Sequence, residues 1–241
     1  MNRIFAFCAL AALGVAGSAL AEDDPEIAAD GGIITKPYKG KYVYVVNGQK
    51  RVAAKDLLVK EGGIEALFNF PVRLVDSGVK MENAGVIVQV NDSPTAPSLL
   101  VAPEAAWAAV NVAALATDKP KPEVLKSRVQ KEVYRAFLFA CGVANSEMQP
   151  CLMRTIKHAK DLDRSPVMQP GPSAVMPIMA SANQLGIFER VQMTYRDACQ
   201  EGWAPEPTND VQKAIWKEVH TPPSKPIKIT YDKDKQKPVV K

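Results

Sequence analysis

The pentapeptide Lys131-Glu132-Val133-Tyr134-Arg135 has the spacing of a catalytic helix but not its ligands. A zinc peptidase helix places two neutral histidines at i and i+4, and the glutamate between them activates the metal-bound water. Glu132 stands in the place of that base, whereas Lys131 and Arg135 stand in the two ligand places. Both are cations without a free lone pair at neutral pH, so they repel Zn²⁺. The pattern excludes a histidine-based zinc site of this type, and we expect no metal and no cofactor.

Glu132 also has an ordinary interpretation. Arg128 precedes it by four residues and Arg135 follows it by three. On an exposed helix face these spacings give ion pairs worth about 0.2–0.5 kcal/mol each. A lone glutamate carries no specificity, so the surrounding elements must decide whether it lies in a cleft or on open surface.

Around this pentapeptide, the periodicity predicts a helix from Pro122 to about Ala140, which Gly142 terminates. Apolar residues recur on one side of the helix at helical spacing. The expected buried positions are Leu125, Val129, Val133, Ala136, Phe137 and Ala140.

Strand patterns precede this helix, and further helix patterns follow it. The expected strands are Lys41–Asn47, Pro71–Ser77, Ala84–Asp92 and an edge strand within Trp107–Val112. The expected helices are Val52–Phe68, interrupted by Gly62-Gly63, and the segments 173–186, 191–202 and 208–220. Because strands come early and helices late, the fold class is α+β, with a small mixed sheet of about four strands packed on helices.

From Ala84 to about Asp163 the order of segments resembles the archaemetzincins, a branch of the metzincin-type zinc peptidases. The matching segments are "AGVIVQVND", "AAWAAVNVAAL", "VLKSRVQKEVYRAFLFAC" and "CLM". They follow the family's order of a central strand, an apolar edge strand, a helix of the form HExxHxxGxxHC and a C-x-M segment. The resemblance covers roughly a third of the chain and implies a metzincin-like fold.

Carried over by position, the resemblance makes Lys131, Glu132 and Arg135 a vestigial site. Leu138 stands for the family's glycine, and Cys141 for the third histidine or, in a shifted alignment, for the first cysteine. The family's later CxxC is absent from the sequence. The resemblance therefore implies a scaffold that has lost its zinc ligands.

In the "CLM" segment, the resemblance makes Met153 a Met-turn-like residue. Three cysteines follow the N-terminal apolar segment, namely Cys141, Cys151 and Cys199. In an oxidising compartment two of them are expected to bridge. Cys141 with Cys151 closes the shortest loop and is the preferred pair, with Cys141–Cys199 as the alternative.

The N-terminus has the three parts of a secretory signal: Arg3, a short apolar run and small residues that end at Ala21. We expect residues 1–21 to be a signal peptide cleaved after Ala21, and the mature protein to be secreted or periplasmic. We expect a flexible lead-in at 22–40, a single α+β domain at 41–220 and an extended or disordered basic tail at 221–241.

Charge and hydropathy limit the classes of partner that the protein can have. The net charge of +4 is spread along the chain without a basic block interleaved with aromatics, so nucleic acid is not expected as a partner. After signal cleavage no segment is long and apolar enough to span a membrane. The composition is compatible with a protein or peptide partner.

Two functions agree with these features. The first is a secreted or periplasmic non-catalytic protein, whose inactive zincin-like domain is a binding or structural module with a cleft that favours a carboxylate or another anion. The second is an active secreted metal-dependent hydrolase that uses Glu132 with non-standard ligands, such as Cys141 and His158.

Overall fold

The computed structural model describes residues 29–59, 63–146, 151–165, 175–221, 229–232 and 237–240. Pro37–Arg190 belong to one compact unit, while the described residues 29–36 and those from Val191 onward belong to a second. The boundary between the two units, after Arg190, falls within the stretch 41–220, and the single domain expected there stays a prediction. The predicted signal peptide, residues 1–21, lies outside the described residues.

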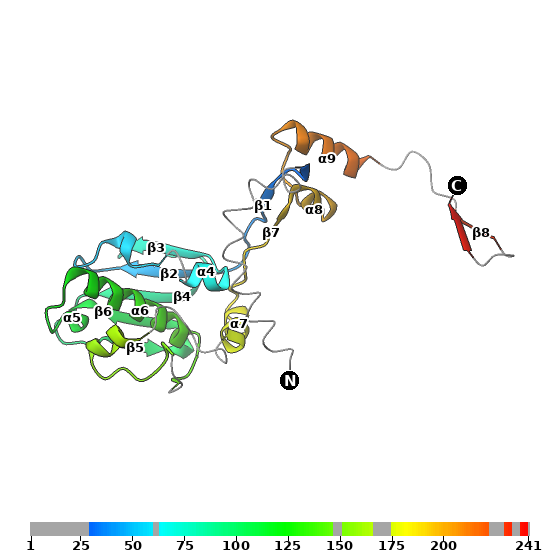
Figure 1. Ribbon diagram of the computed structural model, residues 1–241. Coiled ribbons are helices and arrows are strands. Elements are labelled where there is room, and N and C mark those ends of the chain that lie inside the picture. The colour runs from blue at the N-terminus through cyan, green and yellow to red at the C-terminus, as the bar shows by residue number, and fades with distance from the viewer. Residues whose placement is uncertain are drawn as a thin grey trace. The chain divides into compact units, whose positions relative to one another are not determined.

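The first unit is built on a five-stranded mixed sheet (Figure 1). Its strands, in order across the sheet, are β3 (Val72–Asp76), β2 (Tyr42–Asn47), β4 (Ala84–Asn91), β6 (Trp107–Asn111) and β5 (Leu99–Ala102). All neighbours run parallel except β5, which pairs antiparallel with β6. The α+β class and the strands expected in the early part of the chain are confirmed. The strand at Trp107 is interior rather than at the edge, because β5 pairs along its outer side.

The long helix α6 spans Pro122–Ala140 and packs across β4, β6 and β5 (Figure 1). Of the expected apolar stripe, all members are buried except Leu125, which is partly buried. The helix ends at Gly142, whose φ of 78° suits a residue without a Cβ. The Val143 amide then donates to the Leu138 carbonyl at 3.1 Å, which satisfies one of the last helical carbonyls. The predicted helix is confirmed.

The single helix expected over Val52–Phe68 is wrong. The chain forms a 3₁₀ turn, η1 (Ala54–Asp56), and a separate short helix, α4 (Ile64–Phe68). Gly63 has extended backbone angles, and a Cβ there would lie 2.2 Å from the Val59 carbonyl oxygen. Gly63 therefore precedes a separate short helix rather than lying inside one continuous helix.

Shorter elements complete the first unit. They are η2 (Pro103–Ala105), α5 (Val112–Leu115), η3 (Ala159–Arg164) and α7 (Val175–Gln184). The last of these confirms the helix expected in 173–186.

In the second unit, β1 (Ile33–Thr35) pairs antiparallel with β7 (Gln192–Thr194). The other elements are α8 (Tyr195–Gln200), α9 (Asp210–His220) and the antiparallel pair β8 (Ile229–Asp232) and β9 (Lys237–Val240). A small core of Tyr195, Cys199 and Ile215 holds α8 and α9 together. Asn209 caps α9, since its side chain accepts from the Gln212 amide at 2.9 Å.

Two expectations for this unit differ from the structure. β1 lies inside the stretch 22–40 that the sequence predicts as a flexible lead-in, because pairing with β7 supplies partners for its backbone. The helix expected over 191–202 begins as β7 and becomes helical at Tyr195. In the part of the chain that the structure describes, no helix has the length and apolarity needed to cross a bilayer.

Asn111, at the end of β6, fixes the loop that leads into β5. Its side-chain oxygen accepts from the amides of Ser93 and Ala113, at 2.9 and 3.2 Å. Its amide group donates to the carbonyls of Ser93 and Ala96. Because the side chain is buried, these bonds are shielded from water and fix the loop that precedes β5.

We therefore expect Asn111→Ala to lower the free energy of unfolding by about 2–3 kcal/mol, because it leaves several buried polar groups without a partner. Urea denaturation followed by circular dichroism measures the loss. Asp92→Ala is the control, since its ion pair with Arg51 is partly exposed and is worth less than about 1 kcal/mol. Equal midpoints for the two variants would show that Asn111 is not an anchor.

Candidate functional site

A cleft of about 670 Å³ opens beside the edge strand β5 in the first unit. α6 contributes one wall, and the chain around η3 contributes another. The lining residues are Pro97, Ser98, Leu99, Val101, Ala114, Thr117, Glu132, Arg135, Phe139, Asn145, Thr155, Ile156, Lys157, His158 and Ala159. The cleft lies within the size range of small-molecule sites and combines apolar side chains with a few charged ones.

A buried ion pair between Glu132 and Arg135 lies in the wall of this cleft. Arg135 Nη1 donates to Glu132 Oε2 at 2.6 Å, and the two side chains are 4% and 1% exposed. The Ser98 side chain also hydrogen-bonds Glu132. Burial raises the pKa of Glu132, and the charge and hydrogen bond of Arg135, with the bond from Ser98, oppose that rise. The expected exposed pair is thus a buried one.

Arg135 has three distinct environments around its guanidinium group. Nη1 meets Glu132, and Nη2 donates to the Arg154 carbonyl at 3.1 Å. Nε is buried and has no hydrogen-bond partner among the described residues. The guanidinium carbon also lies 5.4 Å from the ring centre of Phe139. Arg135, which lines the cleft, therefore keeps one buried donor unused.

Lys131 is buried but does not line the cleft. Its Nζ donates to the Leu162 carbonyl at 2.8 Å, in η3. Burial lowers the pKa of Lys131, and the nearby Asp163 carboxylate opposes that change. Arg135 therefore lines the cleft, whereas Lys131 binds the neighbouring η3 segment.

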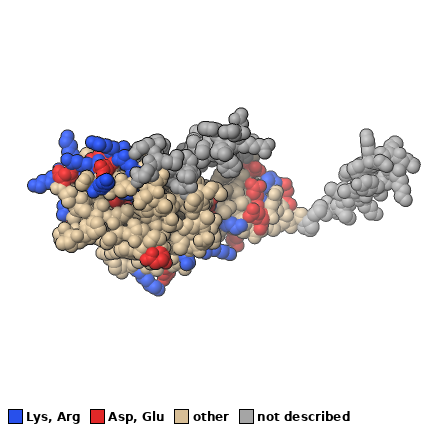
Figure 2. Space-filling model, turned by 90° about the horizontal axis from the view of Figure 1, so that it is seen from below, with Lys and Arg blue, Asp and Glu red and all other residues tan. Residues whose placement is uncertain are grey.

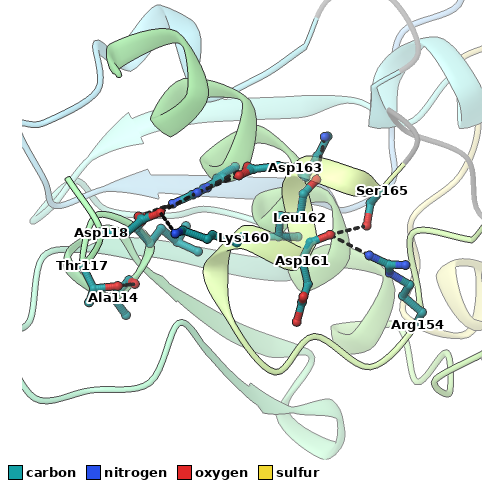
Figure 3. A network of polar contacts seen from close by, with 12 residues as sticks. Ala114, Thr117, Asp118, Arg154, Lys160, Asp161, Leu162, Asp163 and Ser165 are labelled. Atoms are coloured by element: carbon teal, nitrogen blue, oxygen red, sulfur yellow. Dashed lines mark hydrogen bonds and ion pairs between the residues drawn. The ribbon is translucent and has the colours of Figure 1, made fainter. Parts of the chain in front are cut away.

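Arg128 bridges two carboxylates from other parts of the chain. Its guanidinium lies between two carboxylates, with Nη1 2.6 Å from Asp118 and Nη2 2.7 Å from Asp163. Figure 3 shows Asp118 and Asp163 at the two ends of one line of contacts, with Lys160 near Asp118. Hydrogen bonds from Arg128 are the main reason that the pKa of both carboxyls is lowered. The same contacts raise the pKa of Arg128.

Arg128, Lys131 and Arg135 form what we call the cationic stripe of α6. Their spacing of three and four residues puts them on one side of the helix. Each contacts the segment 154–163: Arg128 through Asp163, Lys131 through the Leu162 carbonyl, and Arg135 through the Arg154 carbonyl. Arg154 and Ser165 in turn donate to the Asp161 carbonyl (Figure 3). The stripe therefore fixes the segment that carries the far wall of the cleft.

The residues in the vestigial site do not fit a zinc ion. Lys131 and Arg135 offer no lone pair, and the Arg135 guanidinium already lies against the Glu132 carboxylate. Burial raises the pKa of Cys141 to about 12, which keeps it a thiol rather than a metal-binding thiolate. His158 does line the cleft with Glu132. Over the described residues, no three side chains of His, Cys, Asp or Glu are grouped so that they could hold a metal.

The remaining residues of the predicted site are core residues. Cys141, Cys151 and Cys199 are buried free thiols, so the expected Cys141–Cys151 bridge is not formed in the structure. Met153 is fully buried, and its amide donates to Cys151 Sγ at 3.3 Å. Leu138, in the place of the family's glycine, is also fully buried.

Four residues of this site were missed by the sequence analysis as functional or anchoring groups: Ser98, Asp118, Arg128 and Asp163. Arg128 did carry a signal, because it continues the line of charged residues through Lys131 and Arg135 on one helix face. Its partners, Asp118 and Asp163, lie 10 and 35 residues away in the sequence. The residues around them do not indicate that they pair with Arg128.

Surface charge is uneven on the face drawn in Figure 2. Lys and Arg gather toward one side of the view with acidic residues among them, and much of the rest of that face carries neither. Nucleic-acid interfaces are far more uniformly basic. That nucleic acid is not a partner stays a prediction.

No protein-family model matches the sequence, and no curated protein matches it. Three solved structures are similar in fold. Archaemetzincin from Methanopyrus kandleri is 15% identical with a TM-score of 0.47, over 60% of this chain and 96% of that one. A zinc-dependent peptidase from Methanocorpusculum labreanum is 15% identical with a TM-score of 0.43, over 56% and 99%. Archaemetzincin from Archaeoglobus fulgidus, complexed with malonate, is 17% identical with a TM-score of 0.45, over 56% and 99%.

At these identities and TM-scores the similarity says nothing about the chemistry of this chain. The chemistry of this cleft depends on the side chains that this chain itself places there.

Removing one member of the buried ion pair should be costly, whereas removing both should not. We expect Glu132→Ala to lower the free energy of unfolding by about 3 kcal/mol or more, because it leaves Arg135 buried without its counter-charge. The double variant Glu132→Leu/Arg135→Met should lose much less than the sum of the single losses. Chemical denaturation of both variants checks this, and additive losses would contradict it.

The contacts of Arg128 should make stability depend on pH. The folded pKa values of Asp118 and Asp163 lie below the ordinary 3.8, so their stabilisation is complete above that value and is lost as the pH falls through the lowered values. We expect Arg128→Met to lower the melting temperature by several degrees at pH 7 and to weaken the further loss on acidification. Melting curves between pH 7 and pH 2 measure both effects.

A variant that melts lower at pH 7 but keeps the full acid dependence of the wild type would contradict this account. Lys160→Met is the matched control, since Lys160 is exposed and lies 3.9 Å from Asp118. It should change neither the melting temperature nor its pH dependence appreciably.

Proposed function

We propose that the protein is a non-catalytic binding module, secreted or periplasmic, whose cleft takes an organic carboxylate with an apolar body. The C-terminal carboxylate of a peptide is one such ligand. The observation that carries the proposal is that Arg135 lines the cleft and has a buried Nε without a hydrogen-bond partner among the described residues. A carboxylate is the acceptor that best matches a guanidinium donor.

The other lining groups support this ligand class. Leu99, Val101, Phe139 and Ile156 offer apolar contacts, and Lys157 and His158 lie on the wall formed by the η3 region. A ligand with an apolar body and one negative charge would therefore bury its body against the first set and satisfy Arg135 with its head.

Arg135 and Lys131 are also the reason for proposing a non-catalytic role. The guanidinium beside Glu132 supplies the counter-charge that a metal would supply in a zinc peptidase, and it does so permanently. Glu132 in this pair is engaged by Arg135 and Ser98 rather than held ready to activate a water. The pattern of small residues ending at Ala21 supports export.

Benzoate is a suitable first probe, because it combines a carboxylate with a flat apolar body. We expect wild-type protein to bind it and the double variant Glu132→Leu/Arg135→Met to bind it at least about tenfold more weakly, as lost hydrogen bonds to a charged group require. Lys160→Met removes a cation that does not line the cleft and should leave the affinity unchanged. Benzyl alcohol, which lacks the charge, should bind far more weakly than benzoate.

Equal affinity of the wild type and the double variant for benzoate would overturn the proposed site. Titrations should follow the chemical shifts of backbone amides in and around β5, which also locate the ligand.

The second candidate, a metal-dependent hydrolase, is kept because His158 lines the same cleft as Glu132. Under the proposal made here, purified mature protein should retain no stoichiometric zinc, and a chelator should change neither its melting temperature nor its ligand binding. One zinc ion per chain, removed by a chelator together with peptide hydrolysis that also requires Glu132, would favour the hydrolase and sink the non-catalytic assignment.

A further inference from the structure

In the proposed complex, Glu132 and the carboxylate ligand would both bind the guanidinium of Arg135. Glu132 already accepts from Nη1 of Arg135, and Nη2 is engaged by the Arg154 carbonyl. Because Nε is itself buried, a carboxylate that binds it must enter beside the Glu132 carboxylate, which is 1% exposed. Two carboxylates held side by side away from water cannot both stay ionised without a large repulsion.

We propose that Glu132 is an internal competitor for the carboxylate ligand, and that it takes up one proton from solvent when the ligand binds. The proposal rests on the function proposed above and adds its regulation. The exchange is balanced in charge. A Glu132 carboxylate paired with Arg135 plus a free carboxylate and a proton becomes a neutral Glu132 carboxyl beside an Arg135–ligand pair.

The surroundings of Glu132 support this exchange. Burial already raises its pKa, and Arg135 is the main group that opposes the rise. When a ligand draws Arg135 into a second ion pair, that opposition weakens and the pKa rises further. The neutral carboxyl has a hydrogen to donate, to the ligand carboxylate or to the Ser98 hydroxyl beside it.

The other charged groups near the cleft do not supply this proton. Lys157 and His158 line it from the η3 region, and Arg135 lines it from α6. The Asp161 carboxylate accepts from the amides of Lys157 and His158, which lowers its pKa, and Asp163 pairs with Arg128. Lys131 is bound to the Leu162 carbonyl. Glu132 is the one carboxylate among the lining residues, although an imidazole can also titrate in this range and needs its own control.

Glu132 would then decide when the cleft binds. While it is ionised in the free protein and neutral in the complex, the affinity for a carboxylate should rise about tenfold for each unit by which the pH falls, which is the linkage for one proton. The cleft would favour carboxylates in a mildly acidic medium. A neutral ligand of the same shape should show no such dependence.

The test is calorimetric titration of full-length mature protein with benzoate, between about pH 6 and about pH 7.5, where benzoate stays ionised. Each pH is run in two buffers of different ionisation enthalpy, because the difference in apparent binding heat counts the protons exchanged. We expect wild-type protein to take up close to one proton and to bind about tenfold more tightly per pH unit within part of this range.

Glu132→Gln is the decisive variant, since its amide keeps an acceptor for Arg135 but cannot ionise. It should bind benzoate more tightly than wild type at the upper end of the pH range and take up no proton. His158→Gln should keep the proton uptake of the wild type. If Glu132→Gln does not fold, the proton count of the wild type and of His158→Gln still decides the question.

The outcomes separate the two proposals. Binding of benzoate that requires Arg135 but neither depends on pH nor takes up a proton would overturn the role of Glu132 and leave the proposed site standing. Uptake that is lost in His158→Gln and kept in Glu132→Gln would assign the proton to His158 and likewise overturn it. An absence of binding to wild type at every pH would overturn the proposed site and, with it, this inference.

Discussion

The first unit depends on one constraint: α6 carries charged side chains that are buried, and each must find an acceptor. The helix packs its apolar side on the sheet and is covered on its polar side by the segment 154–163. Burying a cation without a partner costs several kcal/mol, so the covering segment must bring carbonyls or carboxylates to fixed places. Arg128, Lys131 and Arg135 determine where those places are. The shape of the cleft follows from that arrangement.

Two residues of the cationic stripe have different roles in the structure, although they occupy equivalent places in the sequence motif. Lys131 and Arg135 occupy equivalent places in a two-ligand motif, yet one is bound within the fold and the other lines the cleft. Arg135 has both roles. It lines the cleft, and it also donates to the Arg154 carbonyl with one nitrogen and to Glu132 with another. A residue with two structural partners and one spare donor is stiff enough to recognise a ligand without first becoming ordered.

The sequence allowed prediction of the elements whose signal is local. α6 and the strands β2, β3 and β4 follow from periodicity and β-branched runs. The edge itself was misplaced, since β5 follows a Pro-rich loop and is short. The burial of the charged side of α6 could not be predicted. It depends on Asp118, Asp163 and the Leu162 carbonyl, which meet the helix only through the tertiary fold.

Lys131 and Arg135 both donate hydrogen bonds to carbonyls of the covering segment. These bonds affect whether a metal site could be built at the two positions. Histidines at positions 131 and 135 would give the sequence the HExxH spacing. An imidazole is shorter than a lysine or arginine side chain and would not reach the Leu162 and Arg154 carbonyls. The covering segment would lose two of its attachments as the ligands appeared. Lys131 and Arg135 therefore anchor the covering segment, and replacing both would remove those anchors.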